Sequence, residues 1–102
     1  WSALEALGRS LSVEYGQYGV RSVCLLTTAI PETPLIDEVF NIHGKAHGTD
    51  YDQFRSFMEG MTHRKRLTSL GELAGAAVFA ASGEGGAVTG TILNLTSGMI
   101  VN

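Results

Sequence analysis

Two histidines in this sequence are four residues apart, a spacing that can bind a metal ion. His43 and His47 would share one face of a helix, an arrangement found in zinc sites. A third ligand would have to come from distant His63 or from Asp50. Two glycines in the same stretch make it a poor helix, which would separate the two imidazoles. We therefore predict no metal site.

The next candidates for an acid or a nucleophile are two tyrosines and a single cysteine. Tyr15 and Tyr18 have glycine neighbours, which predicts a surface turn, so a position at the core edge or in an interface is favoured over an acid role. Cys24 stands in the middle of an apolar run, which indicates a small core residue rather than a reactive thiol. One cysteine cannot form an intramolecular disulfide, so we expect a cytoplasmic protein.

Two further segments carry residues typical of anion binding. Residues 82–86 are rich in glycine but lack the Gly-Lys-Ser/Thr of a phosphate-binding loop, which predicts a turn. The basic run at residues 64–66 is typical of a solvated helix end. The net charge is −3, and nucleic-acid binding needs a broad positive surface, so no such partner is expected. No stretch resembles a signal peptide or a membrane span, and no membrane partner is expected.

The segment best suited to hold a ligand is the end of the apolar run at residues 20–27. That run is typical of a strand buried on both faces. Pro31 and Pro34 then end the ladder because they have no N–H. Open α/β sheets bind ligands where a buried strand opens into such a loop. Thr33 either contacts a ligand or caps the following helix, and Glu32 is expected to be a solvated acid.

The remaining elements frame this loop within a single domain of 102 residues, of which 44% are hydrophobic and 17% charged. Apolar spacing predicts helices at residues 1–15, 35–40, 50–61 and 70–81, with a mobile connection at 41–49. Ser69 and Glu72 have the spacing of a capping box at the start of the last helix. Residues 20–27 and 91–95 predict two parallel strands, so the fold class is α/β with flanking helices.

Four stretches, in this order, resemble the carboxyl-terminal half of a short-chain dehydrogenase/reductase. Residues 4–14 are similar to the helix after the family's catalytic Tyr-x-x-x-Lys, and residues 15–21 are similar to the turn that follows this helix. Residues 66–82 are similar to a late helix of the family, and residues 88–95 to its last strand. The resemblance implies a partial, doubly wound Rossmann-like unit with a variable flap at residues 36–65. The family's Tyr-x-x-x-Lys would precede Trp1, and its Gly-rich cofactor turn has no counterpart here.

The resemblance also implies where a cofactor and a substrate would lie. Residues 28–33 stand in place of the family's Pro-Gly-x-x-x-Thr loop. The resemblance implies contacts to NAD or NADP for Ala29, Ile30, Pro31 and Thr33. It implies contacts to a substrate for the flap residues Leu35, Ile36 and Phe40. Pro31 falls where the family usually offers a backbone N–H to the nicotinamide carboxamide, and proline has none to give.

The implied function is therefore the carboxyl-terminal part of an NAD(P)-dependent oxidoreductase for alcohol or carbonyl substrates, inactive alone because the Tyr and Lys are missing. The alternative is a non-catalytic oligomerisation or interaction module derived from this fold. A small-molecule binding protein that uses the same loop has no residue-level support. A two-stranded sheet leaves apolar surface on the first helix and the first strand uncovered, so we expect a homo-oligomer or association with an amino-terminal half.

Overall fold

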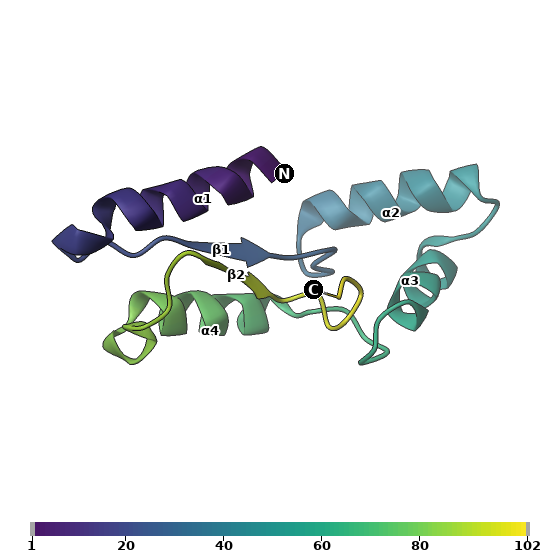
Figure 1. Cartoon of the computed structure of the whole chain (residues 1–102). Helices are drawn as coiled ribbons and strands as arrows, with labels where there is room; N and C mark the ends of the chain where they lie inside the picture. Colours follow the sequence, from purple (N-terminus) through teal and green to yellow (C-terminus); the bar gives the residue numbers. More distant parts are fainter. Residues whose placement is uncertain (1, 102) are drawn as a thin grey trace. The chain divides into compact units, whose positions relative to one another are not determined.

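The computed structural model describes residues 2–101, so Trp1, the first residue of the predicted helix, and Asn102 lie outside the described residues. Its elements, in chain order, are α1 (Ser2–Tyr15), η1 (Gly16–Tyr18), β1 (Val23–Leu26), α2 (Pro34–Ala46), α3 (Tyr51–Gly60), α4 (Leu70–Ala81), η2 (Gly83–Gly85) and β2 (Thr91–Asn94) (Figure 1). They fall into two compact units. The first takes residues 2–26 and 74–93, and the second takes 27–73 and 94–101.

A two-stranded sheet of β1 and β2 forms the centre of the first unit. The strands run parallel, with α1 and α4 on opposite faces (Figure 1). Cys24 of β1 faces α1, where it lies against Gly8. Val23, one residue earlier, lines a hollow together with Ala77 and Ala80 of α4. These observations confirm the predicted α/β class, two parallel strands with flanking helices as in part of a Rossmann-like domain.

The contact between α1 and β1 depends on a glycine in the helix. A Cβ atom at Gly8 would lie 2.9 Å from Cys24 Sγ, closer than side chains tolerate. Further along α1, Ser12 Oγ lies 2.8 Å from Thr89 Oγ1. The same Thr89 oxygen accepts a hydrogen bond from Ser22 N at 3.1 Å, just before β1. Thr89 therefore joins the helix to the entry of the strand.

Both strands are shorter than predicted, because side chains take up backbone groups at their ends. The strand predicted at residues 20–27 covers Val23–Leu26, since Ser22 N donates to the Thr89 side chain rather than to a ladder partner. The strand predicted at 91–95 ends at Asn94, because the Leu95 carbonyl accepts from Thr68 Oγ1 at 2.6 Å. In the described residues, each strand of the sheet is thus four residues long.

A hairpin of α2 and α3 forms most of the second unit. The helix predicted at residues 50–61 is confirmed as α3, and Asp50 and Gln53 form a reciprocal capping box at its start. Phe40 of α2 lies between the helices, 2% exposed. Its ring centroid lies 5.5 Å from that of Tyr51 and 5.2 Å from that of Phe54. This aromatic contact is the main apolar junction between the two helices.

The prediction of a short helix at residues 35–40 followed by a mobile connection was wrong, because α2 continues to Ala46. Pro34 at the first turn favours the helical start. Gly44 has a low helix propensity, but it lies where the backbone of the following turn passes close to α2. A Cβ atom at this position would be 2.9 Å from the Thr49 carbonyl oxygen. Thr49 N donates to the Gly44 carbonyl at 2.7 Å. The glycine serves this crossing rather than breaking the helix.

The first unit leaves much apolar surface uncovered. Leu4 and Leu7 of α1 are 57% and 54% exposed, and Val78 of α4 is 68% exposed. The helix α4 is apolar on nearly all sides, which is typical of a helix covered on more than one face. Within residues 2–101, none of the helices has the length and apolar character needed to cross a membrane.

Candidate functional site

The loop that follows β1 is held in a tight turn by its own residues. Thr33 N and Thr33 Oγ1 both donate to the Ile30 carbonyl, at 3.2 and 2.8 Å. Thr33 occupies the N-cap position of α2, as one of the two sequence interpretations expected, but its side chain makes no capping bond. The hydroxyl proton is therefore used within the loop, and the oxygen keeps only its capacity to accept.

The other predicted cofactor residues lie in the same turn. Ile30 is 6% exposed and anchors the loop in the second unit, whereas Ala29 and Pro31 are half-buried. Pro31 supplies no donor. The Thr28 hydroxyl, which the sequence analysis did not single out, is buried and has no hydrogen-bond partner within residues 2–101. Thr28 thus keeps a donor and an acceptor at the carboxyl end of β1.

Glu32 ties the loop to the start of α4. Its carboxylate accepts a hydrogen bond from Leu70 N at 2.8 Å. Leu70 is the first residue of α4, whose initial N–H groups have no partner within the helix. Glu32 is exposed, as expected of a solvated acid, but it also serves as a helix cap. The carboxyl half of the loop, residues 30–33, is therefore tied to the starts of both α2 and α4.

The three predicted flap residues occupy different environments in α2. Leu35 is 66% exposed, whereas Phe40 is 2% exposed. Ile36 is half-buried. Leu35 and Ile36 lie on the first turn of α2, next to the loop, and Phe40 lies between α2 and α3. Of the three, Leu35 and Ile36 keep surface open to solvent, while Phe40 packs inside the hairpin.

The capping box predicted at the start of α4 is confirmed and includes an arginine. Ser69 N donates to Glu72 Oε1 at 2.9 Å, and Glu72 N donates to Ser69 Oγ at 3.1 Å. Arg66 adds a bidentate pair, with Nη1 and Nη2 each 2.7 Å from a carboxylate oxygen of Glu72. The hydrogen bonds from Arg66, and then from the Ser69 backbone, lower the pKa of Glu72 to about 2.

This cluster predicts that Glu72→Gln lowers stability at neutral pH and has little effect in acid. The folded-state pKa of Glu72 lies below its ordinary value of 4.5, so its ionised form stabilises the fold above pH 4.5. That stabilisation is lost as the pH falls from 4.5 towards 2. The measurement is the urea midpoint of both proteins across this range. A difference between them that stays constant with pH would contradict the prediction, and Glu84→Gln, at an exposed acid on η2, is the control.

Three buried threonines were not singled out from the sequence: Thr62, Thr68 and Thr96, which are 0%, 4% and 1% exposed. Thr68 Oγ1 bonds the Leu95 carbonyl and lies 2.9 Å from Ser97 Oγ. Thr62 Oγ1 donates to Glu59 O at 2.8 Å and accepts from Arg66 N at 3.0 Å. Thr68 thereby joins the chain behind β2 to the segment before α4, whereas the Thr62 bonds stay within residues 59–66. Threonines in loops have no sequence signal that separates this role from solvation.

The remaining chemical candidates are not brought together. His47 Nδ1 lies 2.8 Å from the His43 carbonyl oxygen. No group of three potential metal ligands occurs in residues 2–101. Tyr15 and Tyr18 are 42% and 73% exposed. Cys24 carries a free thiol, half-buried against α1.

A family model described as enoyl-(acyl carrier protein) reductase matches residues 2–100 of the chain. No curated protein matches the sequence significantly. The model match spans both compact units, the loop after β1 and the α2–α3 hairpin. The family relationship therefore concerns nearly the whole chain rather than one motif.

Solved structures share the fold over nearly all of the chain. A short chain dehydrogenase family protein from Francisella tularensis subsp. tularensis SCHU S4 is 18% identical, with a TM-score of 0.89 over 96% of this chain and 40% of that chain. L-sorbose reductase from Gluconobacter frateurii is 24% identical, with a TM-score of 0.84 over 99% and 38%. The N-domain of a bacterial malonyl-CoA reductase is 26% identical, with a TM-score of 0.77 over 98% and 20%. The chain spans at most 40% of these structures.

Proposed function

The chain belongs to the short-chain dehydrogenase/reductase family, and from this premise we propose that it forms the carboxyl-terminal part of an NAD(P)-dependent oxidoreductase domain. The whole domain would act on an alcohol or a carbonyl substrate. The solved L-sorbose reductase contains NADPH and L-sorbose, and the malonyl-CoA reductase domain contains NADP, which supports a nicotinamide cofactor. When bound, that cofactor supplies or accepts the hydride.

The observation that carries this proposal is the fixed loop at the carboxyl end of β1. Ligands of open α/β sheets bind at this end of the strands. The loop is fixed before any ligand arrives, through the Thr33–Ile30 and Glu32–Leu70 bonds, so little ordering cost remains on binding. The buried Thr28 hydroxyl needs a partner, and an amide group such as a carboxamide offers both a donor and an acceptor.

In this proposal the residues of the chain position the reactants rather than transfer protons. Ala29, Ile30, Pro31 and Thr33 shape the wall of the cofactor site, and Thr28 replaces the donor that Pro31 lacks. Leu35 and Ile36 cover the substrate from the first turn of α2. The family's Tyr-x-x-x-Lys and its Gly-rich turn do not occur in residues 1–102. The proton donor and the phosphate site would thus come from another segment, and residues 1–102 alone would be inactive.

The test is a titration of the chain with NADPH and NADH, followed by the fluorescence of the nicotinamide. We expect saturable binding without turnover, and Thr28→Val should weaken binding about five- to tenfold, the usual effect of losing one hydrogen bond. The Thr28 hydroxyl makes no hydrogen bond within residues 2–101, so the fold should not change. Thr91→Val, on the exposed start of β2, is the matched control. Equal binding by Thr28→Val, or turnover of a carbonyl substrate by the chain alone, would contradict this assignment.

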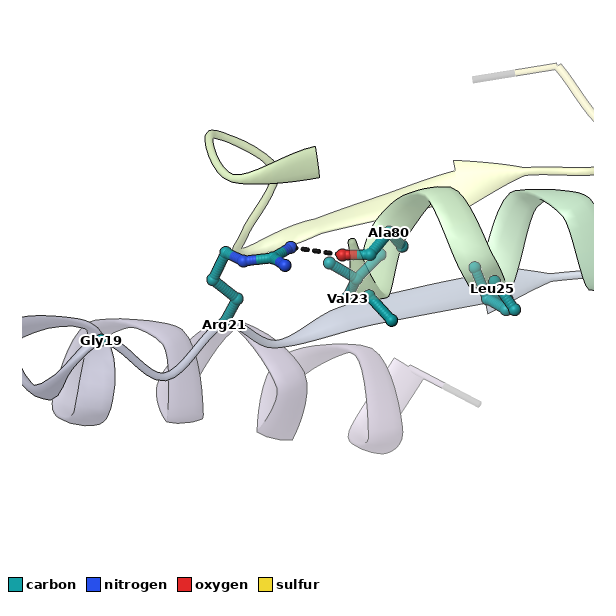
Figure 2. A pocket seen from close by; sticks show the side chains of 7 residues that line it. Gly19, Arg21, Val23, Leu25 and Ala80 are labelled. Atoms are coloured by element: carbon teal, nitrogen blue, oxygen red, sulfur yellow. Dashed lines mark hydrogen bonds between the residues drawn. The ribbon is translucent and has the colours of Figure 1, made fainter. Parts of the chain in front are cut away.

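The second candidate is a non-catalytic oligomerisation or interaction module, which the uncovered surface of the first unit favours. A hollow of about 380 Å³ opens beside β1 and α4, with Arg21, Val23, Leu25 and Ala80 on its wall (Figure 2). Together with the exposed leucines of α1, it would be covered by a second copy or by an amino-terminal half. Light scattering separates the two functions: self-association with a flat cofactor titration would favour the module. A monomer at all concentrations would exclude a homo-oligomer.

The proposed setting of the protein is the cytoplasm, without a nucleic-acid or membrane partner. The net charge of −3 disfavours a nucleic-acid partner, which would need a broad positive surface. The free thiol of Cys24 is also typical of a reducing compartment.

A further inference from the structure

A small apolar pocket lies within the α2–α3 hairpin, apart from the loop that follows β1. Its volume is about 200 Å³, and His47, Thr49, Gln53, Phe54 and Phe57 line it. An engineered apolar cavity of about 150 Å³ is large enough to take benzene. The pocket is therefore of the size of one six-membered ring, and too small for a nucleotide or a sugar phosphate.

The wall of the pocket consists of aromatic rings that already pack against one another. The centroid of the Phe54 ring lies 6.4 Å from that of Phe57 and 6.1 Å from that of His47. Both neighbouring rings are tilted by about 35° or less against Phe54, within the range of separations that aromatic pairs prefer. Phe57 is 63% exposed, which is an unusual position for a phenylalanine. A further aromatic ring would cover it and continue the stack.

Three polar residues line the pocket: the Thr49 hydroxyl donates to the Gly44 carbonyl at 3.2 Å, and His47 and Gln53 have defined hydrogen-bonding roles. The His43 carbonyl can only accept, so His47 Nδ1 donates to it, and in this tautomer of the imidazole Nε2 is the acceptor. Gln53 Oε1 accepts from Asp50 N at 3.1 Å, so its amide nitrogen keeps two donors. One acceptor and one donor group thus stand beside an apolar wall. A phenolic hydroxyl, which donates one hydrogen and accepts another, matches this pair.

From this geometry we propose that the α2–α3 hairpin contains a binding site for a phenol-type ligand, a single aromatic ring that bears a hydroxyl group. The ring covers the exposed face of Phe57 next to Phe54, and the hydroxyl donates to His47 Nε2 and accepts from the Gln53 amide. The site stands apart from the proposed hydride transfer, because all its residues belong to the hairpin.

The test uses 4-fluorophenol as the probe, observed by fluorine NMR in the presence of the whole chain without any nicotinamide cofactor. We expect saturable binding with a dissociation constant of about 1 mM, in keeping with a ligand of eight non-hydrogen atoms. Fluorobenzene, which lacks the hydroxyl, should bind at least about fivefold more weakly. Equal affinity of the two probes, or a response that does not saturate, would overturn the proposal.

Two variants locate the probe. Phe57→Ala removes an exposed ring and should weaken binding about tenfold, while Phe79→Ala, at an exposed phenylalanine of α4, should leave it unchanged. Gln53→Glu keeps the oxygen that caps α3, because capping boxes accept either residue, but removes the amide donors. It should weaken 4-fluorophenol several-fold and leave fluorobenzene unchanged. Unaltered binding by Phe57→Ala, or an equal loss in Phe79→Ala, would overturn the site.

Discussion

Replacing Phe40 by alanine is expected to open the α2–α3 hairpin, at a cost of about 3–5 kcal/mol. The side chain is 2% exposed and contacts the rings of Tyr51 and Phe54. Alanine would leave a cavity between the helices and remove both aromatic contacts. Hydrogen exchange measures this effect directly: amides of α2 and α3 should exchange about a hundredfold faster or more, since each 1.4 kcal/mol corresponds to a factor of ten.

Leu35→Ala is the matched control, because both residues belong to the predicted flap. Leu35 is 66% exposed, so its truncation should change stability by less than about 0.5 kcal/mol. The two variants also separate packing from substrate contact. In an active full-length enzyme, Leu35→Ala should affect substrate binding without changing exchange rates in the hairpin. Unchanged protection of α2 and α3 in Phe40→Ala would show that Phe40 does not hold the hairpin.

The sequence predicts an element well where the determining interactions are local. The helix expected at residues 70–81 is α4, Leu70–Ala81, with both bounds correct. Its capping box consists of Ser69 and Glu72, three residues apart, and the arginine that joins them, Arg66, is also close along the chain. The same is true of Asp50 and Gln53 at the start of α3. Such signals can be recognised without knowledge of the tertiary structure.

The sequence predicts an element poorly where its bounds depend on a contact that belongs to no local motif. Gly44 lowers helix propensity, yet α2 passes through it because the turn at Thr49 crosses there. The ends of the strands were misplaced for the same reason, since Thr68 and Thr89 lie far from the groups they bind along the chain. Pairings of this kind depend on the fold and leave no periodic pattern in the sequence.

The loop proposed as a site does follow β1, but the hydrogen bonds of its side chains were not foreseen. The change from an apolar run to two prolines indicates where a loop begins, because proline removes a donor whatever the context. Whether a hydroxyl already has a hydrogen-bond partner depends on atoms three residues away or more. Thr33 donates within its own turn, while Thr28 keeps its hydrogen-bonding capacity. Motif position thus selected a hydroxyl that is already bonded, Thr33, and missed one without a partner within residues 2–101, Thr28.

Arg21→Met is expected to destabilise the first unit by about 2–4 kcal/mol, because this guanidinium caps the end of α4. Its Nη1 donates to the carbonyls of Ala80 and Gly85, the latter at 2.9 Å, and its Nη2 donates to Ser82 O at 3.1 Å (Figure 2). The last turn of α4 contains no basic residue of its own. Arg21 therefore supplies, from the turn before β1, the positive charge and the donors that a helix end requires.

Three variants separate this capping role from a loss of apolar packing or of net charge. Arg21→Met retains a long apolar side chain, so its loss of stability reports the donors. Arg21→Lys should recover only part of the stability, since one ammonium cannot reach carbonyls spread over α4 and η2 as a planar fork does. Arg9→Met, on the exposed surface of α1, removes the same charge and should be neutral within about 0.5 kcal/mol. Urea unfolding measures all three, and full recovery by lysine would show that charge alone suffices at the end of α4.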